Sequence, residues 1–138
     1  MRASDRFEIE IVLAEIRDCL SHVRWKWEEA KQTVSCRIGH ADGKRVRTLL
    51  DRLFLFSCKR NRKARSLPVA HAIIQLHGGL REGQRLWVSD ASRTSGVFAL
   101  WKPWSDGENA TILLGVWSGK DSDDRVLLSS VRKIFRVQ

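Results

Sequence analysis

The sequence predicts an α+β fold in which two N-terminal helices pack on a small antiparallel β-meander, closed by a short C-terminal helix. Apolar residues recur at three- and four-residue intervals through much of residues 12–58. Short β-rich runs alternate with turn residues over 70–117, and helical spacing returns after residue 120. The 138 residues fit a single domain, 1–138, because two domains would each be too small to bury a sufficient core.

The first half, residues 1–65, is predicted to be mainly helical. Residues 7–11 alternate apolar and acidic side chains, which indicates a short strand, with a helix as the alternative. An amphipathic helix follows from Val12 to about residue 31. Residues 33–38 are interpreted as a linker or short strand before a glycine turn at 39–43, and a second helix is expected from Lys44 to Cys58.

The second half, residues 66–138, is predicted to hold the meander and the closing helix. Pro68 is interpreted as the stop of any helical continuation. Strands are expected over 70–76, 85–88, 96–101 and 110–117, in each case ending at turn residues. The acidic run that starts at Asp121 suits the first turn of a helix, which apolar residues at helical spacing continue.

Positive charge is concentrated in residues 44–65. The formal net charge is +9, and basic minus acidic residues give −1 over 1–43, +8 over 44–65 and +2 over 66–138. Such an excess attracts polyanions, and contacts to phosphate need charge more than a fixed side-chain geometry. We therefore predict that RNA binds the block Lys59, Arg60, Arg62, Lys63 and Arg65, with solvated surface charge as the alternative.

Tryptophan is frequent, with six residues in the chain. Trp101 and Trp104 flank Lys102 at the end of a predicted strand, and exposed indole rings can stack on bases. These three residues are predicted to contact RNA, whereas most of the other tryptophans are expected in the core.

Several classes of protein are disfavoured. No apolar run reaches the roughly 20 residues that span a bilayer, and the start of the chain lacks a signal-peptide core, so we expect a cytoplasmic protein without a membrane partner. No phosphate loop, nucleophile elbow or HExxH motif is present, and no cofactor or metal is expected. A zinc set of Cys19, His22, Cys36 and His40 stays open as a degenerate alternative.

The order of motifs in the second half carries a resemblance. It runs through Leu76-His-Gly78, Gln84 to Val88, Ser95 to Trp101, Thr111 to Lys120 and Val126 to Ile134. With these motifs the chain resembles the RelE/ParE superfamily of type II toxin–antitoxin toxins over about half its length. It departs from the family pattern at Ala99, where an arginine is usual, and at Asp121 and Leu127, where basic and aromatic residues are frequent.

The resemblance implies a toxin that cleaves mRNA on the ribosome without a metal and that a small antitoxin holds inactive. Cleavage by the RNA 2′-hydroxyl needs cations to stabilise charge at phosphorus and a group that takes up the proton. Arg85, Arg93 and Lys120 are the predicted cationic centre, and His77 is the predicted acid–base residue because histidine titrates near neutrality.

Two other functions remain open. One is a non-catalytic module on the same scaffold that binds RNA, a ribosome or a protein such as gyrase, and the departures from the family pattern favour it. The other is an inhibitor or assembly factor, in which the basic segment meets an acidic protein. Growth arrest with or without RNA cleavage would separate the toxin from both.

Overall fold

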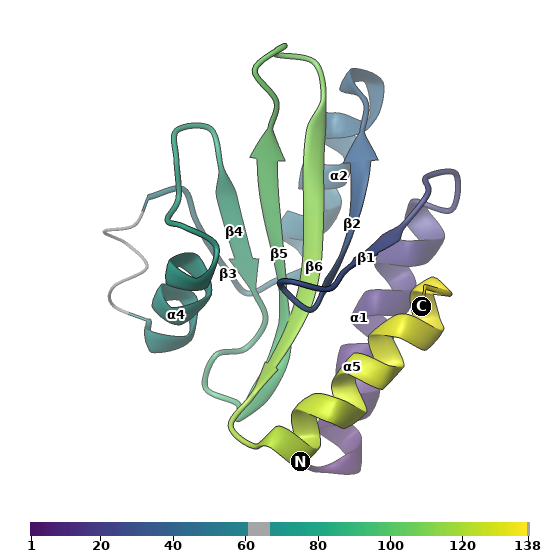
Figure 1. Ribbon diagram of the computed structural model, residues 1–138, viewed down its shortest axis with the longest axis vertical. Coiled ribbons are helices and arrows are strands. Elements are labelled where there is room, and N and C mark those ends of the chain that lie inside the picture. The colour runs from purple at the N-terminus through teal and green to yellow at the C-terminus, as the bar shows by residue number, and fades with distance from the viewer. Residues whose placement is uncertain (61–66, 138) are drawn as a thin grey trace.

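The computed structural model describes residues 1–60 and 67–137 (Figure 1). Within them the elements are α1 (Ala3–Cys19), β1 (Lys26–Glu28), β2 (Thr33–Ile38), α2 (His40–Leu53), β3 (Phe56–Cys58), α4 (Pro68–Leu76), β4 (Arg85–Val88), β5 (Ser95–Pro103), β6 (Ala110–Ser118) and α5 (Asp121–Phe135). The strands form one antiparallel sheet in the order β1-β2-β6-β5-β4-β3. The predicted α+β class is confirmed.

The predicted arrangement, two helices followed by a meander, is wrong. Three strands of the first half, β1, β2 and β3, belong to the same sheet as β4, β5 and β6. β2 pairs with β6 from Val34 opposite Leu114 to Ile38 opposite Ala110, and β3 pairs with β4 at the other edge. Both halves of the chain therefore build the sheet.

α1 occupies the segment where a strand was predicted over residues 7–11, and it ends well before residue 31. Ile9, Leu13 and Ile16 follow helical spacing and are buried, whereas Phe7 is 63% exposed. The short alternation of apolar and acidic residues is therefore part of an amphipathic helix. The spacing of buried residues over the whole of α1, not the alternation over five residues, indicates the structure.

The last residues of the predicted first helix, from residue 26 onward, form the first strand and the turn of the β1–β2 hairpin instead. Lys26 pairs with Ser35 and Glu28 with Thr33 across the two strands. The turn between them is closed by Gln32, which has φ 52° and whose side-chain amide donates to the carbonyl oxygen of Glu29 at 2.8 Å. The helical spacing of apolar residues in this region was coincidental, because the backbone N–H and C=O groups form their hydrogen bonds by strand pairing.

α2 begins and ends earlier than predicted. It starts at His40 and runs through Gly43, which was expected in a turn but lies buried inside the helix. It ends at Leu53, and the three residues of β3 then pair with β4, with Phe56 opposite Val88. An edge strand thus replaces the last turn of the predicted helix.

α4 occupies the segment where a strand was predicted over residues 70–76. Pro68 lies in the first helical turn, where its missing N–H is not needed, so it begins a helix instead of preventing one. Ile73 and Ile74 are buried on the side that faces the sheet. The N–H of Gly79, at φ 88°, donates to the carbonyl of Ile74 at 2.8 Å and ends the helix.

The remaining predictions for the second half are confirmed. The strands expected over 85–88, 96–101 and 110–117 are β4, β5 and β6, and the C-terminal helix is α5. Its first turn carries Asp121, Asp123 and Asp124, which complement the positive end of the helix dipole. In the described part of the chain no helix is both long and apolar enough to cross a bilayer.

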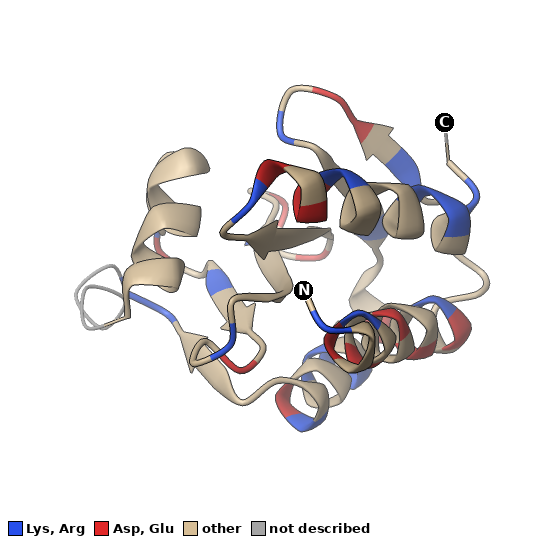
Figure 2. Cartoon of the chain, turned by 90° about the horizontal axis from the view of Figure 1, so that it is seen from below, with Lys and Arg blue, Asp and Glu red and all other residues tan. Residues whose placement is uncertain are grey.

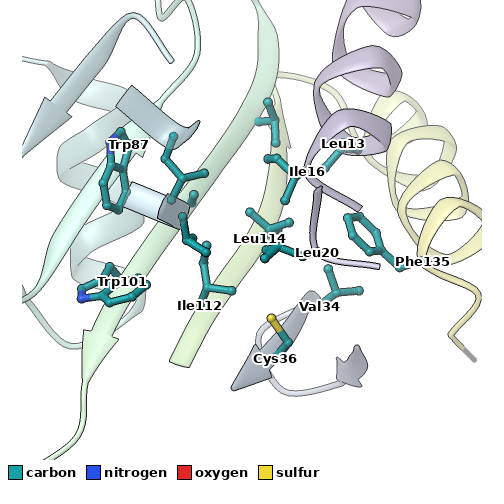
Figure 3. Close-up of a cluster of buried hydrophobic side chains, with 14 of the residues drawn as sticks. Leu13, Ile16, Leu20, Val34, Cys36, Trp87, Trp101, Ile112, Leu114 and Phe135 are labelled. Atoms are coloured by element: carbon teal, nitrogen blue, oxygen red, sulfur yellow. The ribbon is translucent and has the colours of Figure 1, made fainter. Parts of the chain in front are cut away.

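Helices cover both faces of the sheet (Figure 1). α1, α2 and α5 pack on one face, which we call the three-helix face; α4 packs on part of the other, the α4 face. Side chains from helices and strands meet on the three-helix face, among them Leu13, Ile16, Val34, Trp87, Trp101, Ile112, Leu114 and Phe135 (Figure 3). The core of the α4 face contains Ile73, Ile74, Leu86, Val88, Phe98, Leu100 and Leu113.

Candidate nucleic-acid interface

One end of β5 meets α2 around Trp101. A Cβ on Gly43 would lie 3.6 Å from the Trp101 ring, an ordinary contact distance, and 3.3 Å from the Arg47 guanidinium, so this part of α2 packs directly against Trp101. The guanidinium carbon of Arg47 lies 5.0 Å from the ring centre of Trp101, within the range of a cation–π contact. The close packing of α2 on β5 thus fixes a cation beside an aromatic ring.

Two adjoining hollows share Arg47, Trp101 and Pro103 as a common wall. One, of about 420 Å³, is also lined by Lys59, Gly83, Gln84 and Arg85. The other, of about 410 Å³, is also lined by residues that include His40, Lys44, Glu108 and Asn109. We call the two hollows together the Trp101 groove.

The Trp101 groove carries uncompensated positive charge. Lys44, Arg47 and Lys59 form no ion pair with a carboxylate in residues 1–60 and 67–137. Glu108 contributes one carboxylate to the lining. Cations without partners next to a groove attract phosphate groups, and each neutralised phosphate releases counterions.

Arg85 lines the groove, but its charge is compensated. Its guanidinium hydrogen-bonds to the carboxylate of Asp51 on α2 and donates to Ser57 Oγ at 3.0 Å. It also lies over the ring of Trp87, 4.6 Å from the ring centre. The geometry gives Arg85 a role in joining α2 to β4, and its predicted catalytic role stays a prediction.

Arg93 and Lys120 lie together at the other end of the sheet. Arg93 is in the loop between β4 and β5, and Lys120 directly precedes α5; the N–H of Gly119 donates to the carbonyl of Thr94 at 3.1 Å and joins the two loops. Carboxylates of Asp5, Asp90 and Glu8 surround the Arg93 guanidinium at 2.6, 3.5 and 3.7 Å. Glu8 and then Asp5 raise the pKa of Arg93.

His77 lies on the α4 face, so the four predicted catalytic residues do not share one cleft. It follows α4, and its ring contacts Phe98 edge-on at 5.8 Å between ring centres. Burial, with smaller contributions from Lys102 and Lys31, lowers the pKa of His77 to about 4. At neutral pH this histidine is therefore uncharged, away from Arg85 and from Arg93.

The predicted RNA-binding residues are divided between surfaces. Lys59 and Trp101 line the Trp101 groove, and Arg60 is exposed next to Lys59. Arg62, Lys63 and Arg65 lie outside the described residues, and Lys102 lies on the α4 face, in register with Thr111.

The two tryptophans predicted to stack on bases have different settings. Trp101 is 6% exposed and serves as a wall of the groove, with little ring face left for stacking. Trp104 is 43% exposed, and its indole N–H donates to Thr111 Oγ1 at 2.9 Å. Of the two, Trp104 has the accessible ring that base stacking requires.

The possible zinc ligands Cys19, His22, Cys36 and His40 do not gather at one point. Cys36 is 3% exposed in the core, where burial raises the pKa of its thiol to about 12 and disfavours the thiolate that binds metal. His22 pairs with Asp42 at 3.0 Å. In the described part of the chain no three His, Cys, Asp or Glu side chains are placed to hold a metal ion.

Sequence reasoning placed two groove residues, Lys44 and Arg47, only in the expected second helix and in the basic segment 44–65. The signal that could have found Arg47 is its spacing of four residues from Gly43, which places both on one side of α2. The spacing gains meaning only once Trp101 is known to pack there, because that contact joins residues far apart in the chain.

Comparison of the chain with protein-family models, with curated proteins and with solved structures gives no match.

Proposed function

We propose that the protein is an RNA-binding module and that the Trp101 groove holds phosphates of the RNA backbone. The observation that supports this most strongly is that Lys44, Arg47 and Lys59 line one groove without carboxylate partners in the described residues. Phosphate contacts account for much of the affinity of nucleic-acid-binding proteins. The net charge of +9 adds long-range attraction.

RNA is preferred over other polyanions on the strength of the RelE/ParE resemblance, which stays a prediction. Ribosome association and a small antitoxin partner rest on the same resemblance and also stay predictions. Cleavage of mRNA needs several groups at one scissile phosphate. Arg85, Arg93, Lys120 and His77 are spread over different ends and faces of the sheet, so we place binding ahead of catalysis.

The test compares two variants with the same loss of charge. The variant Arg47→Gln/Lys59→Gln removes two of the three groove cations that have no carboxylate partner in the described residues. The control Arg125→Gln/Lys133→Gln removes two exposed cations of α5. Affinity for a labelled single-stranded oligoribonucleotide is measured by fluorescence anisotropy between about 50 and about 200 mM salt. We expect the groove variant to lose affinity and to lower the slope of log K against log salt by about 1.4, the value for two phosphate contacts.

The α5 variant should keep most of the wild-type affinity and slope. Equal losses in both variants would show that net charge alone attracts RNA and would overturn the groove as the binding site. RNA length is followed in the same samples, with a chelator present. Intact RNA agrees with a binding module; chelator-resistant cleavage that Lys120→Ala abolishes would restore the ribonuclease hypothesis.

A further inference from the structure

The α4 face of the sheet is only partly covered. α4 packs against the sheet at β4, whereas no helix lies in front of the upper parts of β5 and β6 in Figure 1. In this open part, Arg37 of β2, Thr111 of β6 and Lys102 of β5 are cross-strand neighbours. Side chains at such positions project on the same side of a sheet.

Basic side chains from three segments gather at this open part. They are Lys31 in the turn between β1 and β2, His77 and Arg81 after α4, and Lys102 on β5; we call them the α4-face cluster. Lys31 Nζ donates to the carbonyl of Leu76 at 2.7 Å, which holds it against the end of α4. The loop that carries Arg81 runs beside the end of β5, because a Cβ on Gly83 would stand 3.1 Å from the ring of Pro103, the residue after Lys102. Burial, then Lys31 and Arg81, lower the pKa of Lys102.

The α4-face cluster lacks compensation by carboxylates. Lys31, Arg81 and Lys102 form no ion pair within the part of the chain that the structure describes. Glu28, on the same face, accepts a hydrogen bond from Ser35 and pairs with Lys26.

The imidazole of the cluster also has an unused polar atom. Nε2 of His77 is buried without a hydrogen-bond partner among the described residues. Like charges held together in a partly buried setting repel one another, and a bound anion relieves this repulsion.

We propose that the α4-face cluster is a second anion site, which binds a phosphate group. Three cations from separate segments converge on one area, and a phosphate presents oxygens to several donors at once. The site lies on the opposite face of the sheet from the Trp101 groove, and it does not depend on the function proposed for that groove. The phosphate comes either from a free phosphate or nucleotide, or from a nucleic-acid backbone.

The experiment uses the full chain and follows the ring signals of His77 by NMR during pH titrations. Inorganic phosphate is the first probe, and chloride at equal ionic strength controls for screening. We expect saturating phosphate to raise the pKa of His77 by about 1, because the bound anion offsets Lys31 and Lys102. The increase should saturate with phosphate concentration and be absent with chloride.

Two variants test whether the cluster is responsible. Lys102→Gln and the exposed Arg81→Gln should each weaken the phosphate response at least several-fold, whereas Lys133→Gln on α5 should keep it. An equal effect of chloride, or an unchanged response in both cluster variants, would overturn the site. A hydroxyl-ended oligoribonucleotide then identifies the source: a response to it supports backbone phosphate, and a response to phosphate alone supports a free phosphate or nucleotide.

Discussion

Asp51 shows how a single side chain can decide the role of its neighbours. Its carboxylate accepts hydrogen bonds from Arg85 and from the indole N–H of Trp87, the latter at 2.9 Å. Trp87 is fully buried, so water cannot replace the Asp51 carboxylate as the acceptor for its N–H. The sequence shows an arginine at the start of a strand, but not the aspartate 34 residues earlier that neutralises it.

Removing the Asp51 carboxylate should destabilise the fold. We expect Asp51→Ala to lower the free energy of unfolding by about 1–3 kcal/mol, because the N–H of Trp87 loses its acceptor in the core. Asp51→Asn should cost less, since its amide oxygen can still accept from Trp87. Urea unfolding measures both, with Asp18→Ala as the control for loss of an exposed carboxylate. Equal losses in Asp51→Ala and Asp18→Ala would refute this role.

Residue types were predictable from the sequence, but their pairing was not. The excess of charge in residues 44–65 directed attention to Lys59, which lines the Trp101 groove. Arg93 carries the same charge but lies among Asp5, Glu8 and Asp90. Two of these carboxylates come from α1, and no local pattern links residues 5–8 to residue 93.

At the scale of elements, short segments were predicted least well. Residues 26–28 and 56–58 each form a strand of three residues, too short for any period to be read, and both had been assigned to helices. Their structure depends on a partner strand: β2 for the first and β4 for the second. β5, β6 and α5 are longer, and their patterns were sufficient to predict them.

Close contact between β5 and β6 requires a glycine at position 115. Gly115 lies directly opposite Phe98, and a Cβ there would stand 2.4 Å from the Phe98 ring and 3.0 Å from a methyl of Thr33. We expect Gly115→Ala to reduce the free energy of unfolding by about 1–3 kcal/mol, because the core must shift to admit the methyl group.

Gly119→Ala is the matched control, since a Cβ there meets nothing within 4 Å. Urea unfolding of both variants should show a clear loss for Gly115→Ala and little change for Gly119→Ala. Comparable stability of the two would mean that Phe98 can move aside at no cost.

For the molecule as a whole, both candidate anion sites exist only because distant segments meet. The Trp101 groove combines α2 with the ends of β3 and β5, and the α4-face cluster combines the β1–β2 turn, the end of α4 and β5. Positions of charged residues are blue or red along α1, α2 and α5 in Figure 2, whereas α4 contains no Lys, Arg, Asp or Glu. The net charge indicated a polyanion as partner, but the placement of the two candidate sites on opposite faces of the sheet follows only from the fold.

The strand order also predicts that neither half of the chain folds alone. A fragment of residues 67–138 would lose β2 from the side of β6, β3 from the side of β4, and the cover of α1 and α2 over Trp87 and Leu114. We expect this fragment and a fragment of residues 1–66 each to show poorly dispersed amide NMR signals and no cooperative unfolding. Mixing them should restore the signals of the intact chain, because the unpaired strand edges and apolar surfaces are complementary. A native-like spectrum of 67–138 alone would instead show that β4, β5, β6, α4 and α5 are a self-sufficient unit.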